Sequence, residues 1–273
     1  MPNPEVFAPT TLAQNSNGRV ILSCDIGSHY SDEFLTTKAN CNRWCADAWR
    51  FYYSDYPRGC PPHSEQMYAF KIFAMDEAIR YGFRHVLWMD SSLAPLASIE
   101  PLWKVIESQG WYAAPQYNGI TTGQPWRHWA STTMATLGEW CSDSALEILN
   151  ISRLRALGIP LALTGLVGLD MMNPVGRKIW EMHKGFYACG VFNGAHTNVR
   201  GAPLTANGNG KFKGHVSDDP RVHGHRHDET SLSAILDKLG LAPMNLGFWT
   251  LESTNGFIGQ FTHRFGLTYK AKP

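Results

Sequence analysis

The chain of 273 residues carries nearly balanced charge, with 24 Lys and Arg against 23 Asp and Glu. Hydrophobic residues make up 44% of the chain and charged residues 17%. This composition excludes disordered and fibrous proteins, and the net charge of +1 argues against binding to nucleic acid or anionic membrane through bulk electrostatics. The length is sufficient for one domain with a substantial core.

The sequence shows no sign of a membrane span or of a disulfide framework. No run approaches the ~20 apolar residues that cross a bilayer, and Met1-Pro2-Asn3-Pro4-Glu5 lacks the features of a signal peptide. We therefore expect a cytoplasmic protein with reduced thiols. Cys41 and Cys45 lie one helical turn apart, and packing into a core accounts for this spacing more simply than a shared metal does.

The first half of the chain alternates strand and helix patterns. This alternation predicts an α/β fold with an open, mostly parallel twisted sheet that is flanked by helices. In such a sheet ligands gather at the carboxyl ends of the strands, here near residues 24–28 and 90–92. The predicted elements are a strand at 19–24, helices at 32–53 and 64–81, a strand at 85–89, a helix at 99–109 and a strand at 110–114.

The second half is less regular. A stretch over 194–219 contains five glycines and no periodicity, so we interpret it as a mobile, Gly-rich lid loop. No repeat or linker interrupts the chain, which we treat as a single domain over 1–273. The other expected elements are short helices near 144–149 and 151–157, an apolar segment at 161–169, a helix near 174–183 and a helix over 229–239 with Asp228 as its cap.

Asp90-Ser91-Ser92 directly follows the apolar strand at 85–89. A carboxylate at the end of a buried strand suits a divalent cation or the ribose and phosphate of a nucleotide. The alternative is that Asp90 only caps the turn that follows.

A histidine-rich segment, residues 221–230, precedes the last predicted helix. If residues 223–227 are extended, His223, His225 and His227 project to one face and could bind a metal or an anionic substrate. A structural zinc site is the other reading, but it needs four well-spaced ligands. Asp228 can act as helix cap and reacting carboxylate at once.

Lys71 lies on the predicted helix before the Asp90 strand, where a lone lysine is usually a solvated surface residue. Other catalytic motifs are missing from the sequence, including the phosphate-binding Gly-rich loops, the GxSxG nucleophile elbow and HExxH. Hydrolase and nucleotide-triphosphatase functions are disfavoured accordingly.

The segment from Tyr81 to Leu93 resembles the helix-strand-acid step of GT-A-fold nucleotide-sugar glycosyltransferases. The strand ending at Cys24-Asp25-Ile26, the Lys71 helix, the segment 139–143 and Gly224-His225-Arg226-His227-Asp228-Glu229 resemble, in the same order, glycosyltransferase-like proteins of bacteria and viruses. The resemblance covers roughly residues 19–245. It implies a GT-A-like domain with a nucleotide-binding half at 19–115 and an acceptor half at 116–273, in the host cytoplasm if the protein is viral.

The resemblance also assigns roles to individual residues. The donor-binding set it implies is Cys24, Asp25, Ile26, Lys71, Asp90, Ser92 and Arg226. Asp228 is the expected catalytic base of an inverting reaction, and Asp90, His225 and His227 are the expected ligands of Mn²⁺ or Mg²⁺. Ser92 stands where the family usually has a second acid, which puts tight metal binding in question; the histidines could instead replace the charge of the cation.

The function implied is transfer of a sugar from a nucleoside-diphosphate donor, expected to be UDP-linked, to an acceptor hydroxyl. The acceptor can be a saccharide or a hydroxymethylated DNA base, since Arg200, Lys211, Lys213 and Arg221 could contact a polyanion. The alternative is a noncatalytic nucleotide- or carbohydrate-binding module, which the serine at position 92 favours.

Overall fold

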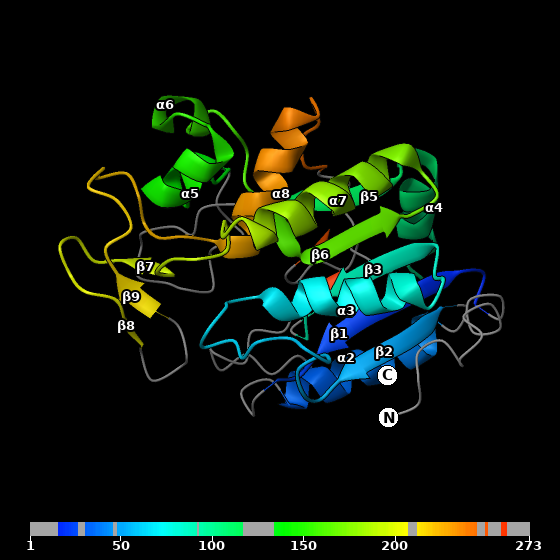
Figure 1. Ribbon diagram of the computed structural model, residues 1–273. Coiled ribbons are helices and arrows are strands. Elements are labelled where there is room, and N and C mark those ends of the chain that lie inside the picture. Colours follow the sequence, from blue (N-terminus) through cyan, green and yellow to red (C-terminus); the bar gives the residue numbers. More distant parts are fainter. Residues whose placement is uncertain are drawn as a thin grey trace.

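The computed structural model is a three-layer α/β/α arrangement built around one five-stranded sheet (Figure 1). No helix among the described residues combines the length and the apolar character needed to cross a bilayer. The structure describes residues 16–26, 31–45, 48–91, 93–116, 134–206, 212–244, 249–250 and 258–260.

The central sheet has the strand order β2-β1-β3-β6-β5. Strand β1 pairs in parallel with β2 and β3, whereas β6 pairs antiparallel with both β3 and β5. Four of these described strands therefore point the same way, which confirms the predicted mostly parallel sheet. The strands are β1 (Arg19–Cys24), β2 (Trp49–Tyr53), β3 (His85–Met89), β5 (Trp111–Pro115) and β6 (Ala162–Asp170).

Helices cover both faces of the sheet (Figure 1). Side chains alternate along a strand, so Val86 and Trp88 of β3 belong to one core and Leu87 and Met89 to the other. The first core lies under α3 (Ala69–Arg80), α7 (Pro174–Ala188) and α8 (His227–Lys238), and the second under α2 (Ser31–Trp44) and α4 (Glu100–Gln109).

Smaller elements surround this sheet. A three-stranded sheet joins β4 (Leu93–Pro95) to β11 (Ile258–Gln260) and β10 (Trp249–Thr250). The 3₁₀ helix η2 (Leu137–Glu139) and the helices α5 (Asp143–Leu149) and α6 (Arg153–Ala156) lie between β5 and β6 in the chain.

The predicted helix over 32–53 is wrong in its second part. Helix α2 ends at Trp44, and residues 49–53 form the edge strand β2 beside β1. The run Trp49-Arg50-Phe51-Tyr52-Tyr53 is rich in aromatic residues, which favour strands. Cys41 and Cys45 are fully buried in the second core, as the packing interpretation predicted.

The starts of two helices also differ from the prediction. Helix α3 begins at Ala69 rather than near residue 64, because Tyr68 has a left-handed backbone that interrupts the helical turns before it. The last helix is capped by Arg226 rather than by Asp228, which lies in its first turn.

The Gly-rich stretch over 194–219 is not structureless. It contains the strands β7 (Thr197–Asn198), β8 (Thr205–Ala206) and β9 (Phe212–Gly214), which pair into a small sheet at the left of Figure 1. Residues 207–211 lie outside the described part of the chain.

Two glycines of α7 make a matched test of how tightly this helix packs on the sheet edge. A Cβ at Gly176 would lie 2.3 Å from the carbonyl oxygen of Gly110 and 2.4 Å from that of Asp170, whereas nothing lies within 4 Å of one at Gly185. We expect Gly176→Ala to lower the free energy of unfolding by about 1–3 kcal/mol and Gly185→Ala to raise it by about 0.5–1 kcal/mol. Urea unfolding measures both; equal effects would contradict this packing.

Candidate functional site

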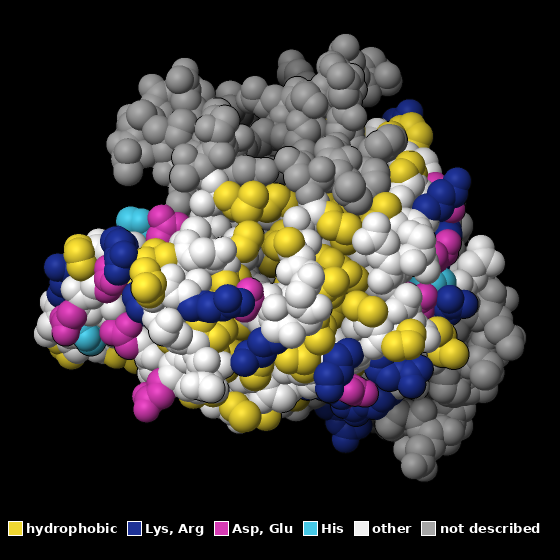
Figure 2. All heavy atoms as spheres, turned by 90° about the horizontal axis from the view of Figure 1, so that it is seen from above, with side chains coloured by type: hydrophobic (Ala, Val, Ile, Leu, Met, Phe, Trp, Pro, Cys, Tyr) yellow, Lys and Arg dark blue, Asp and Glu magenta, His cyan; other side chains and the backbone are white. Residues whose placement is uncertain are grey.

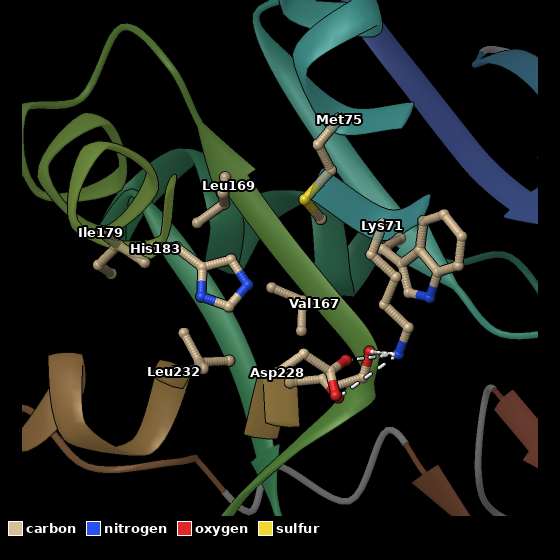
Figure 3. Close-up of a pocket in the computed structure, with 10 residues that line it drawn as sticks. Lys71, Met75, Val167, Leu169, Ile179, His183, Asp228 and Leu232 are labelled. Atoms are coloured by element: carbon tan, nitrogen blue, oxygen red, sulfur yellow. Dashed lines mark hydrogen bonds and ion pairs between the residues drawn. The ribbon is translucent and has the colours of Figure 1, made fainter. Parts of the chain in front are cut away.

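The two carboxylates singled out in the sequence meet at one ammonium group. Lys71 Nζ lies 3.2 Å from Asp90 Oδ1 and 2.9 Å from Asp228 Oδ2. Figure 3 shows Lys71 reaching from α3 toward Asp228 on α8. Asp90 follows β3 at the carboxyl end of the parallel strands, so the strand end and the histidine-rich segment converge in space.

Lys71 is enclosed by polar and aromatic partners. Its Nζ donates to the Thr164 carbonyl oxygen at 3.0 Å and lies 5.3 Å and 5.5 Å from the ring centroids of Tyr68 and Trp88. Although burial opposes the charge, Asp228 and Asp90 raise the pKa of Lys71 above its ordinary value. The ammonium therefore stays charged, and in this structure it binds the two acids rather than pointing into solvent.

Asp90 keeps one oxygen open. Its Oδ1 accepts a hydrogen bond from Trp88 Nε1 at 2.6 Å and forms the ion pair with Lys71, whereas no described residue bonds to Oδ2. The side chain is 37% exposed. A Cβ at position 165 would lie 3.1 Å from Oδ2, so Gly165 leaves the carboxylate its space. Asp90 is thus held in place while it can still bind a hydroxyl or a cation.

The end of β1 lies beside Asp90. Burial, followed by the charge of Asp90, raises the pKa of the Cys24 thiol, so this thiol stays neutral. Asp25 has a buried Oδ1 with no hydrogen-bond partner among the described residues, and its backbone N–H donates to Tyr53. Ile26 follows as a half-buried residue. Ser92, the remaining expected donor contact on this edge, lies outside the described residues.

His225 and His227 are buried rather than open to the site. The Nε2 atom of His225 donates to the Val191 carbonyl at 2.7 Å, and its Nδ1 accepts from the Ser142 backbone N–H at 3.3 Å. The Nδ1 atom of His227 donates to the Phe192 carbonyl at 2.8 Å. Burial lowers the pKa of His225 to about 4 and that of His227 well below its usual value. Both rings are therefore neutral and fix the chain where it enters α8.

The expectation that three histidines share one face is wrong. His223 is exposed, and its ring packs 5.1 Å from that of Trp140. His227 has a positive φ of 40°, which breaks the extended geometry on which the alternation depended.

The described residues do not fit a protein-held metal site. They include no group of three or more His, Cys, Asp or Glu side chains that could hold a metal ion. Both ring nitrogens of His225 have protein partners, and His227 is fully buried. Of the three expected metal ligands, Asp90 is the one with an open oxygen.

Arg226 lies next to these histidines and is half-buried. Its guanidinium stacks 4.1 Å above the Trp140 ring, and one N–H group donates to His196 Nε2 at 2.6 Å. The stacking holds a permanent positive charge beside the start of α8.

Sequence reasoning missed two further groups. Glu229 follows Asp228, has a buried Oε2 without a partner among the described residues, and burial raises its pKa to about 8. Its place in the histidine-rich segment was a usable signal. Tyr68 packs against both Lys71 and His227, and no sequence pattern pointed to it.

A cavity of about 20 Å³ lies beside the ion pair, between the sheet and the helices α3, α7 and α8 (Figure 3). This volume accommodates about one water molecule. His183 lines it, with Nδ1 2.8 Å from the Ser231 hydroxyl. The other lining residues are Lys71, Met75, Trp88, Thr164, Val167, Leu169, Ile179, Asp228 and Leu232.

Comparison with known proteins gives a distant structural likeness. No protein-family model matches the sequence, and no curated protein matches it. Among solved structures, the chain is similar to one described as a glycosyltransferase involved in the glycosylation of the major capsid of PBCV-1. The identity is 11% and the TM-score 0.33, over 60% of this chain and 65% of the other. The match thus spans less than two thirds of that chain, and the function must be argued from the site.

Proposed function

We propose that the protein is a GT-A-like glycosyltransferase that moves a sugar from a nucleoside-diphosphate donor, a UDP-sugar, to an acceptor hydroxyl. The observation that carries the proposal is the bridge from Lys71 to Asp90 and Asp228 at the carboxyl edge of the parallel strands. Ligands of open α/β sheets bind at this edge. Around the Lys71 ammonium, the bridge brings together the open carboxylate oxygen of Asp90 and the buried carboxylate of Asp228.

Each group has a role in this proposal. Asp90 Oδ2 and the end of β1, Cys24-Asp25-Ile26, bind the nucleotide. Arg226 offsets the charge of the diphosphate, because its guanidinium is fixed by stacking. Lys71 offsets the negative charge of Asp90 and Asp228, and the same ion pairs hold the two carboxylates in position. Asp228 is the general base if the reaction inverts configuration, and a positioning group if it retains configuration; the stereochemistry of the product decides between these.

If Mn²⁺ or Mg²⁺ takes part, it would bind together with the diphosphate, and Asp90 Oδ2 would be the protein oxygen that contacts it. Such a cation would stabilise the charge of the leaving diphosphate. We assign no step to it, because the described residues do not make a metal site of their own.

A saccharide acceptor is favoured over modified DNA. The segment 194–219 is proposed as a lid, and its surroundings carry charges of both signs. Arg221 pairs with Asp219 at 2.5 Å. Figure 2 shows basic and acidic side chains interspersed on the lobe at the left, where the β7–β9 sheet lies. A surface for a polyanion would instead be uniformly basic.

Asp228→Asn tests the catalytic part. General base catalysis is worth about 10²–10⁴ in rate, so turnover of UDP-glucose should fall by that factor while donor affinity stays nearly unchanged. Sugar release and the rise in melting temperature with UDP-glucose measure the two quantities. Asp237→Asn, at the far end of α8, is the control and should match the wild type. Unchanged turnover in Asp228→Asn removes this residue from the mechanism.

The second candidate is a noncatalytic nucleotide- or carbohydrate-binding module. The observation that favours it is the burial of Asp228, whose side chain is only 3% exposed and already paired with Lys71. Nucleotide binding without sugar release, with or without Mn²⁺ and across a panel of acceptors, would support the module. Sugar release by the protein supports the enzyme.

A further inference from the structure

Tyr68 holds a backbone conformation that its residue type disfavours. Its φ of 61° and ψ of 7° are left-handed, which costs a residue with a Cβ about 1–2 kcal/mol. Four described residues other than glycine have positive φ. Two are the asparagines Asn17 and Asn150, which tolerate this conformation, and the other two are Tyr68 and His227.

The two strained residues face each other across the candidate site. The ring centroids of Tyr68 and His227 are 5.6 Å apart. Tyr68 precedes α3, and its carbonyl accepts the backbone N–H of Lys71, while His227 directly precedes Asp228. Strain of this kind persists where the surrounding structure imposes it and is concentrated at functional sites. Lys71 therefore lies one helical turn after the strained Tyr68, and Asp228 lies directly after the strained His227.

The ring of Tyr68 is fixed, whereas its hydroxyl is not engaged. His63 packs edge-on at 4.9 Å and accepts the backbone N–H of Tyr68 through Nδ1 at 3.2 Å. Phe70 lies at 6.1 Å. Among the residues that the structure describes, none forms a hydrogen bond with the Tyr68 hydroxyl, and Tyr68 as a whole is half-buried. The phenol thus has a defined position and an unused donor.

We propose that Tyr68 is a catalytic residue, whose hydroxyl donates a hydrogen bond to the diphosphate oxygen of the nucleotide-sugar at the bond that breaks. The inference rests on the proposed function. The ring lies 5.3 Å from the Lys71 ammonium. Besides the carboxylate of Asp228, the positive charges of Arg226 and Lys71 both act on its hydroxyl, and these two cations would attract the diphosphate.

The phenol keeps its proton in this environment and can therefore donate a hydrogen bond. Burial, and then the carboxylate of Asp228, raises the pKa of Tyr68, so the hydroxyl keeps its proton at neutral pH. A neutral donor that is already in place stabilises negative charge as it develops on a leaving oxygen, without paying for reorientation. The Tyr68 hydroxyl should therefore stabilise the transition state more than it stabilises the bound nucleotide-sugar.

Tyr68→Phe isolates this hydroxyl, because it retains the ring, its packing and the left-handed backbone. Sugar release from UDP-glucose should fall about 10–100-fold in kcat, with KM within about threefold of the wild type. The melting temperature should stay unchanged, since no described residue bonds to the hydroxyl. Tyr81→Phe, at the other end of α3, is the matched control and should keep wild-type kinetics.

Two results would overturn the inference, and they differ. If wild-type protein releases sugar from UDP-glucose and Tyr68→Phe does so at the same rate, the role of Tyr68 is wrong and the proposed function stands. If the wild type neither releases sugar nor gains stability with any UDP-, GDP- or dTDP-sugar, the proposed function fails and the inference fails with it.

Discussion

Lys71→Met is expected to lower the free energy of unfolding by about 3–5 kcal/mol, because it leaves a buried carboxylate without its counter-charge. The side chain of Asp228 is 3% exposed and that of Asp90 is 37% exposed, and each lies within about 3 Å of the lysine nitrogen. A loss of this size corresponds to roughly 10 °C in melting temperature for a chain of this length. Urea unfolding followed by fluorescence or circular dichroism measures it.

A matched control separates the buried pair from an ordinary surface pair. Lys184 lies 3.2 Å from Asp76, but its side chain is 43% exposed. Solvent screens such a pair, so Lys184→Met should change stability by less than about 1 kcal/mol. If both lysine variants were equally mild, the Lys71 bridge would have no special energetic role.

A double variant identifies the cause of the loss. Adding Asp228→Asn to Lys71→Met removes the unpaired buried charge, and we expect it to restore part of the stability. Non-additivity of this kind is the signature of two groups in direct contact. If Lys71 contributed only through its packing against Trp88 and Tyr68, the double variant would be no more stable than the single one.

His183→Gln is expected to weaken the dependence of stability on acid pH. Burial lowers the pKa of His183 from 6.5 to about 4, although Asp228 acts in the opposite direction; Lys71 acts with the burial. Between these values the unfolded chain binds a proton at this ring and the folded chain does not. The stabilisation is therefore complete above pH 6.5 and is lost as the pH falls toward 4. Lowering the pH from 6.5 to 4.5 should cost about 2 kcal/mol at this ring alone.

The measurement is the difference in unfolding free energy between pH 7 and pH 4.5. This difference should be about 2 kcal/mol smaller in His183→Gln than in the wild type. His85, His225 and His227 add to the acid sensitivity in both proteins, whereas Glu229 opposes it, because its pKa is raised. These contributions cancel in the comparison. The exposed His215, changed to Gln, serves as the control, and an identical pH profile in all three proteins would contradict the prediction.

Strands with a continuous apolar pattern were predictable from the sequence. A strand whose formation depends on pairing with a distant segment was not. Residues 19–24 and 85–89 form strands with the predicted bounds, because their continuous β-favouring character has no competing period. Residues 49–53 also carry aromatic side chains at helical spacing, so the local pattern was ambiguous. Pairing with β1, a contact distant in sequence, decides in favour of a strand.

The family resemblance assigned Asp90 and Asp228 to one donor site, and in the structure the two carboxylates do meet. That Lys71 joins them was not predicted. The direction of the long Lys71 side chain depends on where the two carboxylates and Thr164 lie in space. The partners of His225 and His227 are backbone carbonyls, which carry no sequence signature.

The position of β6 constrains the order in which the molecule can form. This strand lies between β3 and β5, yet its residues, Ala162–Asp170, leave the ribosome well after both neighbours. Until then β3 presents an unpaired edge, and the central sheet cannot close across to β5. Unpaired edges of this kind promote association with other chains. Nascent protein is thus most vulnerable to aggregation over the interval between residues 115 and 162, and a binding partner such as a chaperone would protect it there.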